Sequence, residues 1–135
     1  MTVLNNVMFE KIKKIIPAEE AVEMIKLSPE MKKLKLSRDE TVRNIISGKD
    51  DRMLFIIGPC SAENEDSVLD YVSRLGRLAE KVKDKIFIVP RLYTNKPRTR
   101  GEGYKGMMHS PDPHKKLTDI QAGILALRRL HARAI

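Results

Sequence analysis

Tryptophan is absent from this 135-residue chain, and aromatic residues make up only 4% of it, so large aromatic anchors do not dominate its core or interfaces. A single cysteine, Cys60, excludes an internal disulfide framework and fits a reducing compartment. No stretch approaches the roughly 20 apolar residues of a membrane helix. The first residues also lack the basic and apolar regions of a signal peptide. We therefore expect a cytoplasmic protein with no membrane partner.

The chain has an excess of positive charge. It contains 26 Lys and Arg against 18 Asp and Glu, which gives a net charge of +8. Lys81, Lys83 and Lys85 are typical of a solvated surface, but the basic residues that follow an apolar segment at 86–90 lie among Pro and Thr. That stretch offers only two tyrosines for base stacking and has no helix-turn-helix or zinc-finger spacing, so nucleic acid is not the expected partner. Clustered arginines suit small phosphates, because a guanidinium group grips two oxygens.

Apolar spacing and capping signals predict two helices followed by a β-α-β-α alternation. The expected helices are 18–27 behind Pro17, a second opened by a Ser37–Glu40 capping box and stopped by Gly48, a third from about Asp66, and a fourth opened by a Thr118–Gln121 capping box. The expected strands, 53–57 and 86–89, are apolar on both faces, which is typical of parallel strands covered by helices. The alternation indicates a parallel α/β sheet.

Two such strands need further strands beside them, and the last helix runs to Ile135 without a stop signal. We therefore expect the first part of a longer α/β protein. A small two-stranded unit covered by helices is the alternative.

Chemically useful side chains follow both expected strands. Cys60 comes directly after the first strand, Arg91 after the second, and Lys96 and Arg98 just beyond. In parallel α/β folds ligands collect at the carboxyl ends of strands, where a thiolate serves as a nucleophile or a metal ligand. An inert buried cysteine is the alternative. The layout predicts a phosphorylated substrate held beside a metal.

These residues also carry a family resemblance. Ile57-Gly-Pro-Cys-Ser61 together with Arg91-Leu-Tyr-Thr-Asn-Lys-Pro-Arg-Thr99 closely resembles the class I 3-deoxy-D-arabino-heptulosonate-7-phosphate (DAHP) synthases. Tyr104-Lys-Gly-Met107 is similar to the Trp-Lys-Gly-Leu segment of that family, with Tyr in place of Trp. The resemblance covers roughly residues 10–135.

The resemblance implies a (β/α)8 barrel that condenses phosphoenolpyruvate with erythrose 4-phosphate and releases phosphate, the first step of the shikimate pathway to aromatic amino acids. It implies a divalent metal held by one Cys, one His, one Glu and one Asp, of which Cys60 matches the Cys. By the same matching, Arg91 and Lys96 bind phosphoenolpyruvate, and Arg98 and Thr99 bind erythrose 4-phosphate. The complete enzyme is expected to be a homo-oligomer.

A complete (β/α)8 barrel takes about 250 residues, so we expect an N-terminal fragment that is inactive alone. Residues 1–50 would be a helical extension, and residues 51–135 would be the first two β/α units of an incomplete barrel. The alternative is a non-catalytic module that binds phosphate through its basic residues or contacts a partner subunit.

Overall fold

The computed structural model describes residues 13–96, 98, 100–115 and 117–135. Its elements follow the expected order of two helices and then a β-α-β-α alternation. They are α1 (Ala18–Met24), α2 (Pro29–Ile46), β1 (Met53–Ile57), α3 (Glu65–Val82), β2 (Ile86–Pro90) and α4 (Ile120–Arg133). Among the described residues, no helix is long and apolar enough to cross a membrane.

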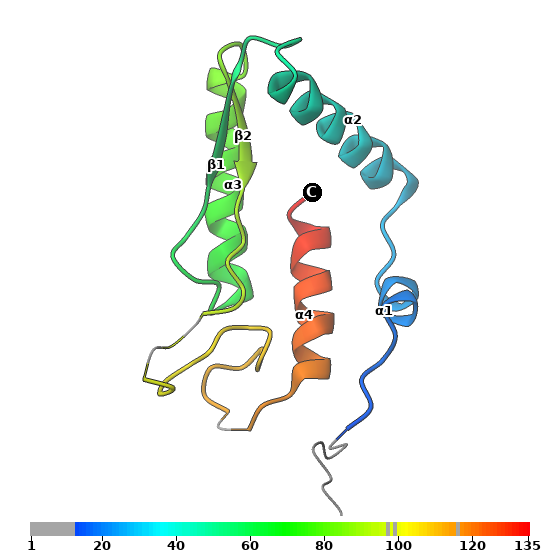
Figure 1. Cartoon of the computed structure of the whole chain (residues 1–135), viewed down its shortest axis with the longest axis vertical. Helices are drawn as coiled ribbons and strands as arrows, with labels where there is room; N and C mark the ends of the chain where they lie inside the picture. The colour runs from blue at the N-terminus through cyan, green and yellow to red at the C-terminus, as the bar shows by residue number, and fades with distance from the viewer. Residues whose placement is uncertain (1–12, 97, 99, 116) are drawn as a thin grey trace, which may run out of the picture.

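The two strands form a parallel sheet in a register that runs from Met53 opposite Ile86 to Ile57 opposite Pro90. Helix α3 connects the strands and packs along the sheet, and α4 packs beside α3 (Figure 1). The α1–α2 arm contacts α4 through α1 and β1 through α2. Because the strands are parallel and in step, both end at the same edge. Figure 1 shows the following loops gathered between this edge and the start of α4.

Two of the predicted helix starts are wrong. Helix α2 begins at Pro29, not near Ser37, because the Ser28 hydroxyl accepts a hydrogen bond from the Met31 amide and Pro29 fits the first helical turn. Ser37 instead lies inside α2. Helix α4 is capped one residue later than predicted, by the Asp119 carboxylate, which accepts from the Ala122 amide.

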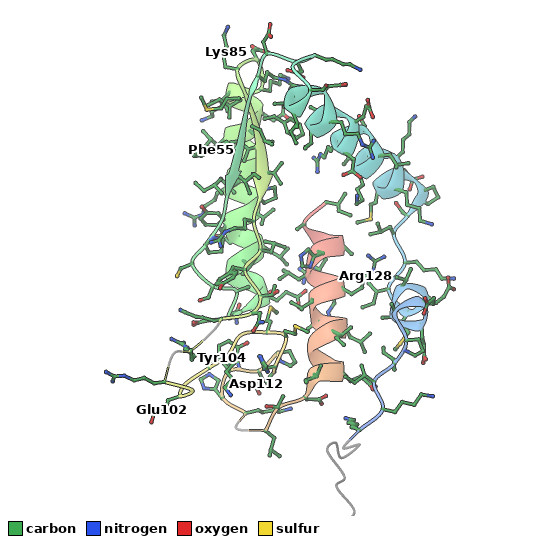
Figure 2. The ribbon with its side chains drawn as sticks, in the orientation of Figure 1. Phe55, Lys85, Glu102, Tyr104, Asp112 and Arg128 are labelled. Carbon is green, nitrogen blue, oxygen red and sulfur yellow. The ribbon has the colours of Figure 1, made fainter. Side chains whose placement is uncertain are left out.

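The buried core is formed by loop and helix residues, and it includes no residue of either strand. It contains Ala62 from the loop after β1, Val68 of α3, Met107 of the long loop, and Ala126 and Leu130 of α4. The sheet is covered less than predicted, since Met53 is 63% and Ile56 is 60% exposed. In Figure 2, Phe55 points away from α4. The strands are apolar on both faces as predicted, but β1 is covered only in part and β2 is half-buried along its length.

An ion pair fixes the entry to β1. The Arg52 Nη2 lies 2.6 Å from Asp50 Oδ2, and the Arg52 Nη1 donates to the Lys83 carbonyl at the end of α3. The Arg52 guanidinium carbon also lies 5.3 Å from the centre of the Phe87 ring on β2. One arginine thus ties the start of β1 to both α3 and β2.

The Asp50→Asn variant is expected to show weaker acid dependence of unfolding than the unmodified chain. The pKa of Asp50 is lowered, first by the hydrogen bond from the Arg52 side chain and then by the Arg52 backbone amide. The stabilising contribution of the carboxylate is therefore present above its ordinary value of 3.8 and is lost as the pH falls through its lower value in the folded chain.

Urea unfolding between pH 7 and pH 3 measures this dependence. The control is Glu40→Gln, which alters an exposed pair with Arg43 on α2 and is expected to change little. Identical pH profiles for Asp50→Asn and the unmodified chain would contradict the prediction.

Candidate functional site

The ends of β1 and β2 are in direct contact. The Arg91 amide donates to the Ile57 carbonyl at 2.8 Å and extends the parallel ladder by one bond. Gly58 then approaches the Arg91 backbone so closely that an added Cβ would overlap the Arg91 carbonyl oxygen and lie 2.7 Å from its carbon. The Gly-Pro-Cys-Ser turn therefore lies against the first residue after β2, as the pairing of parallel strands requires.

Arg91 is held from two sides. Its Nη2 donates to the Pro59 carbonyl at 3.0 Å, and its guanidinium carbon lies 5.0 Å from the centre of the Tyr93 ring. The Tyr93 carbonyl in turn accepts from the amide of Ala62 at 2.7 Å. Residues on both sides of Cys60 thus bond to residues 91–93, and the structure brings the Cys60 turn and Arg91 together.

Cys60 itself is exposed, which excludes the alternative of an inert buried thiol. Within the described ranges, no group of three or more His, Cys, Asp or Glu side chains is placed to hold a metal ion. A stable site for a divalent cation needs several donors in fixed geometry. Cys60 therefore offers one soft ligand, and the described residues alone do not make a metal centre.

Lys96 and Arg98 lie on the loop that follows Arg91, and the segment 104–108, which we call the strap, holds that loop in place. The Lys96 amide donates to the Lys105 carbonyl at 2.9 Å, and the Arg98 Nε donates to the Tyr104 carbonyl at 3.0 Å. A third bond runs from the Met108 amide to the Thr94 carbonyl. Thr99, the remaining predicted site residue, lies outside the described residues.

The strap is anchored at both ends. Met107 is 2% exposed and belongs to the core cluster. The Tyr104 hydroxyl donates to the Ser110 carbonyl at 2.7 Å, within a loop cluster that also holds Asp112 (Figure 2). Burial raises the pKa of Tyr104, and the nearby carboxylates of Glu63 and Asp112 add to the effect. The hydroxyl therefore keeps its proton and remains a donor at neutral pH.

A polar hollow of about 390 Å³ opens beside the strap, and its lining includes Lys105, His109 and Lys115. Gly103, which also lines it, has an ideal Cβ position 3.9 Å from the Arg98 guanidinium carbon. The hollow therefore extends the positive surface that begins at Arg98. Its walls are more polar than apolar and can attract an anion.

The cations of the site carry uncompensated charge within the described part of the chain. Arg91, Lys96 and Arg98 form no ion pair with a carboxylate there, although nine pairs form elsewhere in the same part. Arg91 and Arg98 each donate one hydrogen bond to a backbone carbonyl. A guanidinium group has five N–H donors, so most remain available for an anion.

Two contributors escape sequence reasoning. The sequence indicates Tyr93 only as a possible stacking residue for bases, although residues two apart in an extended segment share a face and its ring lies under the Arg91 guanidinium group. Gly106 reads as an ordinary loop glycine, yet it has φ +102° and packs on the Thr94 backbone. The similarity of residues 104–107 to a family segment was the only signal available for the strap.

Comparison with known proteins gives consistent matches. The model of the DAHP synthetase I family matches residues 23–125. The chain is 38% identical over 102 residues to a phospho-2-dehydro-3-deoxyheptonate aldolase of Haemophilus influenzae, covering 76% of this chain and 28% of that protein. It is 33% identical over 128 residues to the Tyr-sensitive enzyme of that name from Escherichia coli, covering 94% of this chain and 35% of that protein.

A solved structure shows the same likeness. The phospho-2-dehydro-3-deoxyheptonate aldolase of Francisella tularensis superposes with a TM-score of 0.79 at 33% identity, covering 93% of this chain and 36% of that one. The chain thus spans roughly a quarter to a third of the length of the relatives it matches.

Proposed function

The chain belongs to the DAHP synthetase I family, and we propose that it forms the first part of a (β/α)8 barrel that condenses phosphoenolpyruvate with erythrose 4-phosphate and releases phosphate. Residues 1–50 form the helical extension in this proposal, and residues 51–135 form the first two β/α units. The observation that carries it is the contact between the Cys60 turn and Arg91 at the shared end of two parallel strands.

The proposed roles follow from charge and position. Phosphoenolpyruvate carries a carboxylate and a phosphate, and Arg91 and Lys96 supply cationic donors for them near the strand ends. Arg98, beside the polar hollow, and Thr99 hold the phosphate of the second substrate. Fixed donors of this kind position both substrates so that the enol carbon of the first faces the aldehyde carbon of the second.

Cys60 is proposed as one ligand of a divalent metal in the intact barrel. Its exposure leaves the sulfur atom accessible at the strand end. The other donors lie outside the part of the chain that the structure describes, so the described residues alone hold no metal.

The α1–α2 arm is proposed to contact a second subunit of the intact enzyme. It carries exposed apolar side chains, among them Met24 at 60%, Leu36 at 66% and Ile46 at 74%. Exposed apolar side chains gathered on an arm are typical of an interaction surface.

Calorimetry of the chain with phosphoenolpyruvate at low and moderate salt tests the proposed anion site. We expect binding that weakens with salt and falls about 10- to 100-fold in Arg91→Ala, because a hydrogen bond to a charged group is worth about 1.5–3 kcal/mol. Arg74→Ala is the matched control, since it removes the same charge from the exposed surface of α3. Absence of heat at millimolar ligand would rule out this site.

A chimera tests the reaction itself. The matched segment of the E. coli Tyr-sensitive relative is replaced by the corresponding residues of this chain, and phosphate release is followed with both substrates. We expect release that requires both substrates and Arg91. A folded chimera that binds phosphoenolpyruvate without releasing phosphate would instead favour the non-catalytic phosphate-binding module.

A further inference from the structure

We propose that Tyr93 is a positioning residue whose ring fixes the plane of the Arg91 guanidinium group, so that its free N–H edge points to the bound anion. The inference rests on the proposed function of Arg91 and extends it from the contact with Tyr93 to a role of that ring in anion binding. The contact that carries it is the 5.0 Å separation between the guanidinium carbon and the centre of the Tyr93 ring.

Tyr93 can act as a platform because its own backbone is fixed. Its carbonyl accepts from the amide of Ala62, which is fully buried in the core cluster. Its neighbour Leu92 packs against the same cluster. The ring therefore projects from a segment tied to the core, unlike the exposed arginine that it supports.

The second restraint on Arg91 comes from the first loop. The Pro59 carbonyl accepts from Nη2 at 3.0 Å, which leaves four of the five N–H donors unused by that bond. A ring against one face and a carbonyl at one corner together define the guanidinium plane. The remaining edge can then offer two parallel N–H groups to a carboxylate or phosphate without a search through side-chain rotamers.

The contact uses the aromatic face and not the hydroxyl group. A cation over an aromatic ring at an exposed site contributes about a two- to fivefold effect on an equilibrium. Tyr93→Phe keeps the face, whereas Tyr93→Leu keeps an apolar side chain but removes the π system. We expect Tyr93→Leu to weaken phosphoenolpyruvate binding about fivefold, and we expect Tyr93→Phe to bind as well as the unmodified chain.

A double-mutant cycle separates positioning from a structural role. If Tyr93 acts through Arg91, Tyr93→Leu has no further effect on phosphoenolpyruvate binding in an Arg91→Gln background. Equal losses in both backgrounds would overturn the proposal, because they would show that the ring supports the loop in general. Amide NMR spectra of each variant establish that the chain remains folded.

A second measurement requires no ligand. The ring current of Tyr93 is expected to shift the Arg91 side-chain resonances upfield in the unmodified chain and in Tyr93→Phe, and this shift is expected to vanish in Tyr93→Leu. If phosphoenolpyruvate gives no heat, the proposed substrate site fails, while the resonance shift still decides whether Tyr93 holds Arg91. An unshifted Arg91 in the unmodified chain would overturn the positioning role.

Discussion

The Gly58→Ala variant is expected to lose about 3 kcal/mol or more of its free energy of unfolding, at the upper end of the usual cost of overpacking. The added Cβ would overlap the Arg91 carbonyl oxygen and lie 3.1 Å from the Arg91 Cβ. Backbone atoms cannot rotate away as a flexible side chain does. Relief therefore requires the end of β1 to move away from the end of β2.

The same movement separates the two halves of the site. It would break the bond from the Arg91 amide to the Ile57 carbonyl and draw the Pro59 carbonyl away from the guanidinium group. We expect phosphoenolpyruvate affinity to fall at least as far as in Arg91→Ala, about tenfold or more. Urea unfolding and calorimetry on the same preparation measure the two effects.

Gly76→Ala is the matched control. Gly76 lies within α3, where an added Cβ meets nothing within 4 Å, so alanine should stabilise the helix by about 0.5–1 kcal/mol. An unchanged free energy of unfolding in Gly58→Ala would show that the backbones of Gly58 and Arg91 are farther apart than the structure shows.

The sequence predicted the alternation of elements and the strand-end position of Cys60 and Arg91, because both depend on local patterns. Runs that are apolar on both faces locate β1 and β2, and the ends of these runs then show which residues lie just beyond each strand. Helix boundaries were less certain, since several cap patterns compete within a few residues. At α2, Ser28 followed by Pro29 prevailed over the Ser37 capping box, and the helix began nine residues earlier.

Contacts between distant loop residues were beyond sequence reasoning. The backbone of the loop that carries Arg91 and Tyr93 is bonded to Ala62, about thirty residues away in the chain. The coverage of β1 was equally hidden, because a two-faced apolar run has the same sequence whether or not further elements pack on it. Local patterns encode which residues reach the strand ends, whereas the fixing of their side chains depends on long-range packing.

The Gly106→Ala variant is expected to detach the strap and cost about 2–6 kcal/mol, as the sum of two separate penalties. Gly106 has φ +102°, a conformation that costs a residue with a side chain about 1–3 kcal/mol. Its added Cβ would also overlap the Thr94 carbonyl oxygen and lie 3.0 Å from the carbonyl carbon, which adds about 1–3 kcal/mol of overpacking.

The Gly101→Ala variant isolates the first penalty. Gly101 has φ +71°, but an added Cβ there meets nothing within 4 Å, so only the conformational cost of about 1–2 kcal/mol applies. Urea unfolding of both variants measures the difference in free energy of unfolding that is due to the contact between the added Cβ and the Thr94 backbone. Equal losses of stability in the two variants would show that the strap does not pack closely on the Thr94 backbone.

Limited trypsin digestion then tests what the strap does for the site. When the bonds from the Lys96 amide and the Arg98 Nε to the strap are lost, the loop they hold is expected to be cut faster in Gly106→Ala than in Gly101→Ala. Faster cleavage together with weaker phosphoenolpyruvate binding would connect the strap to the cations it restrains. Faster cleavage with unchanged affinity would place the binding energy on Arg91 alone.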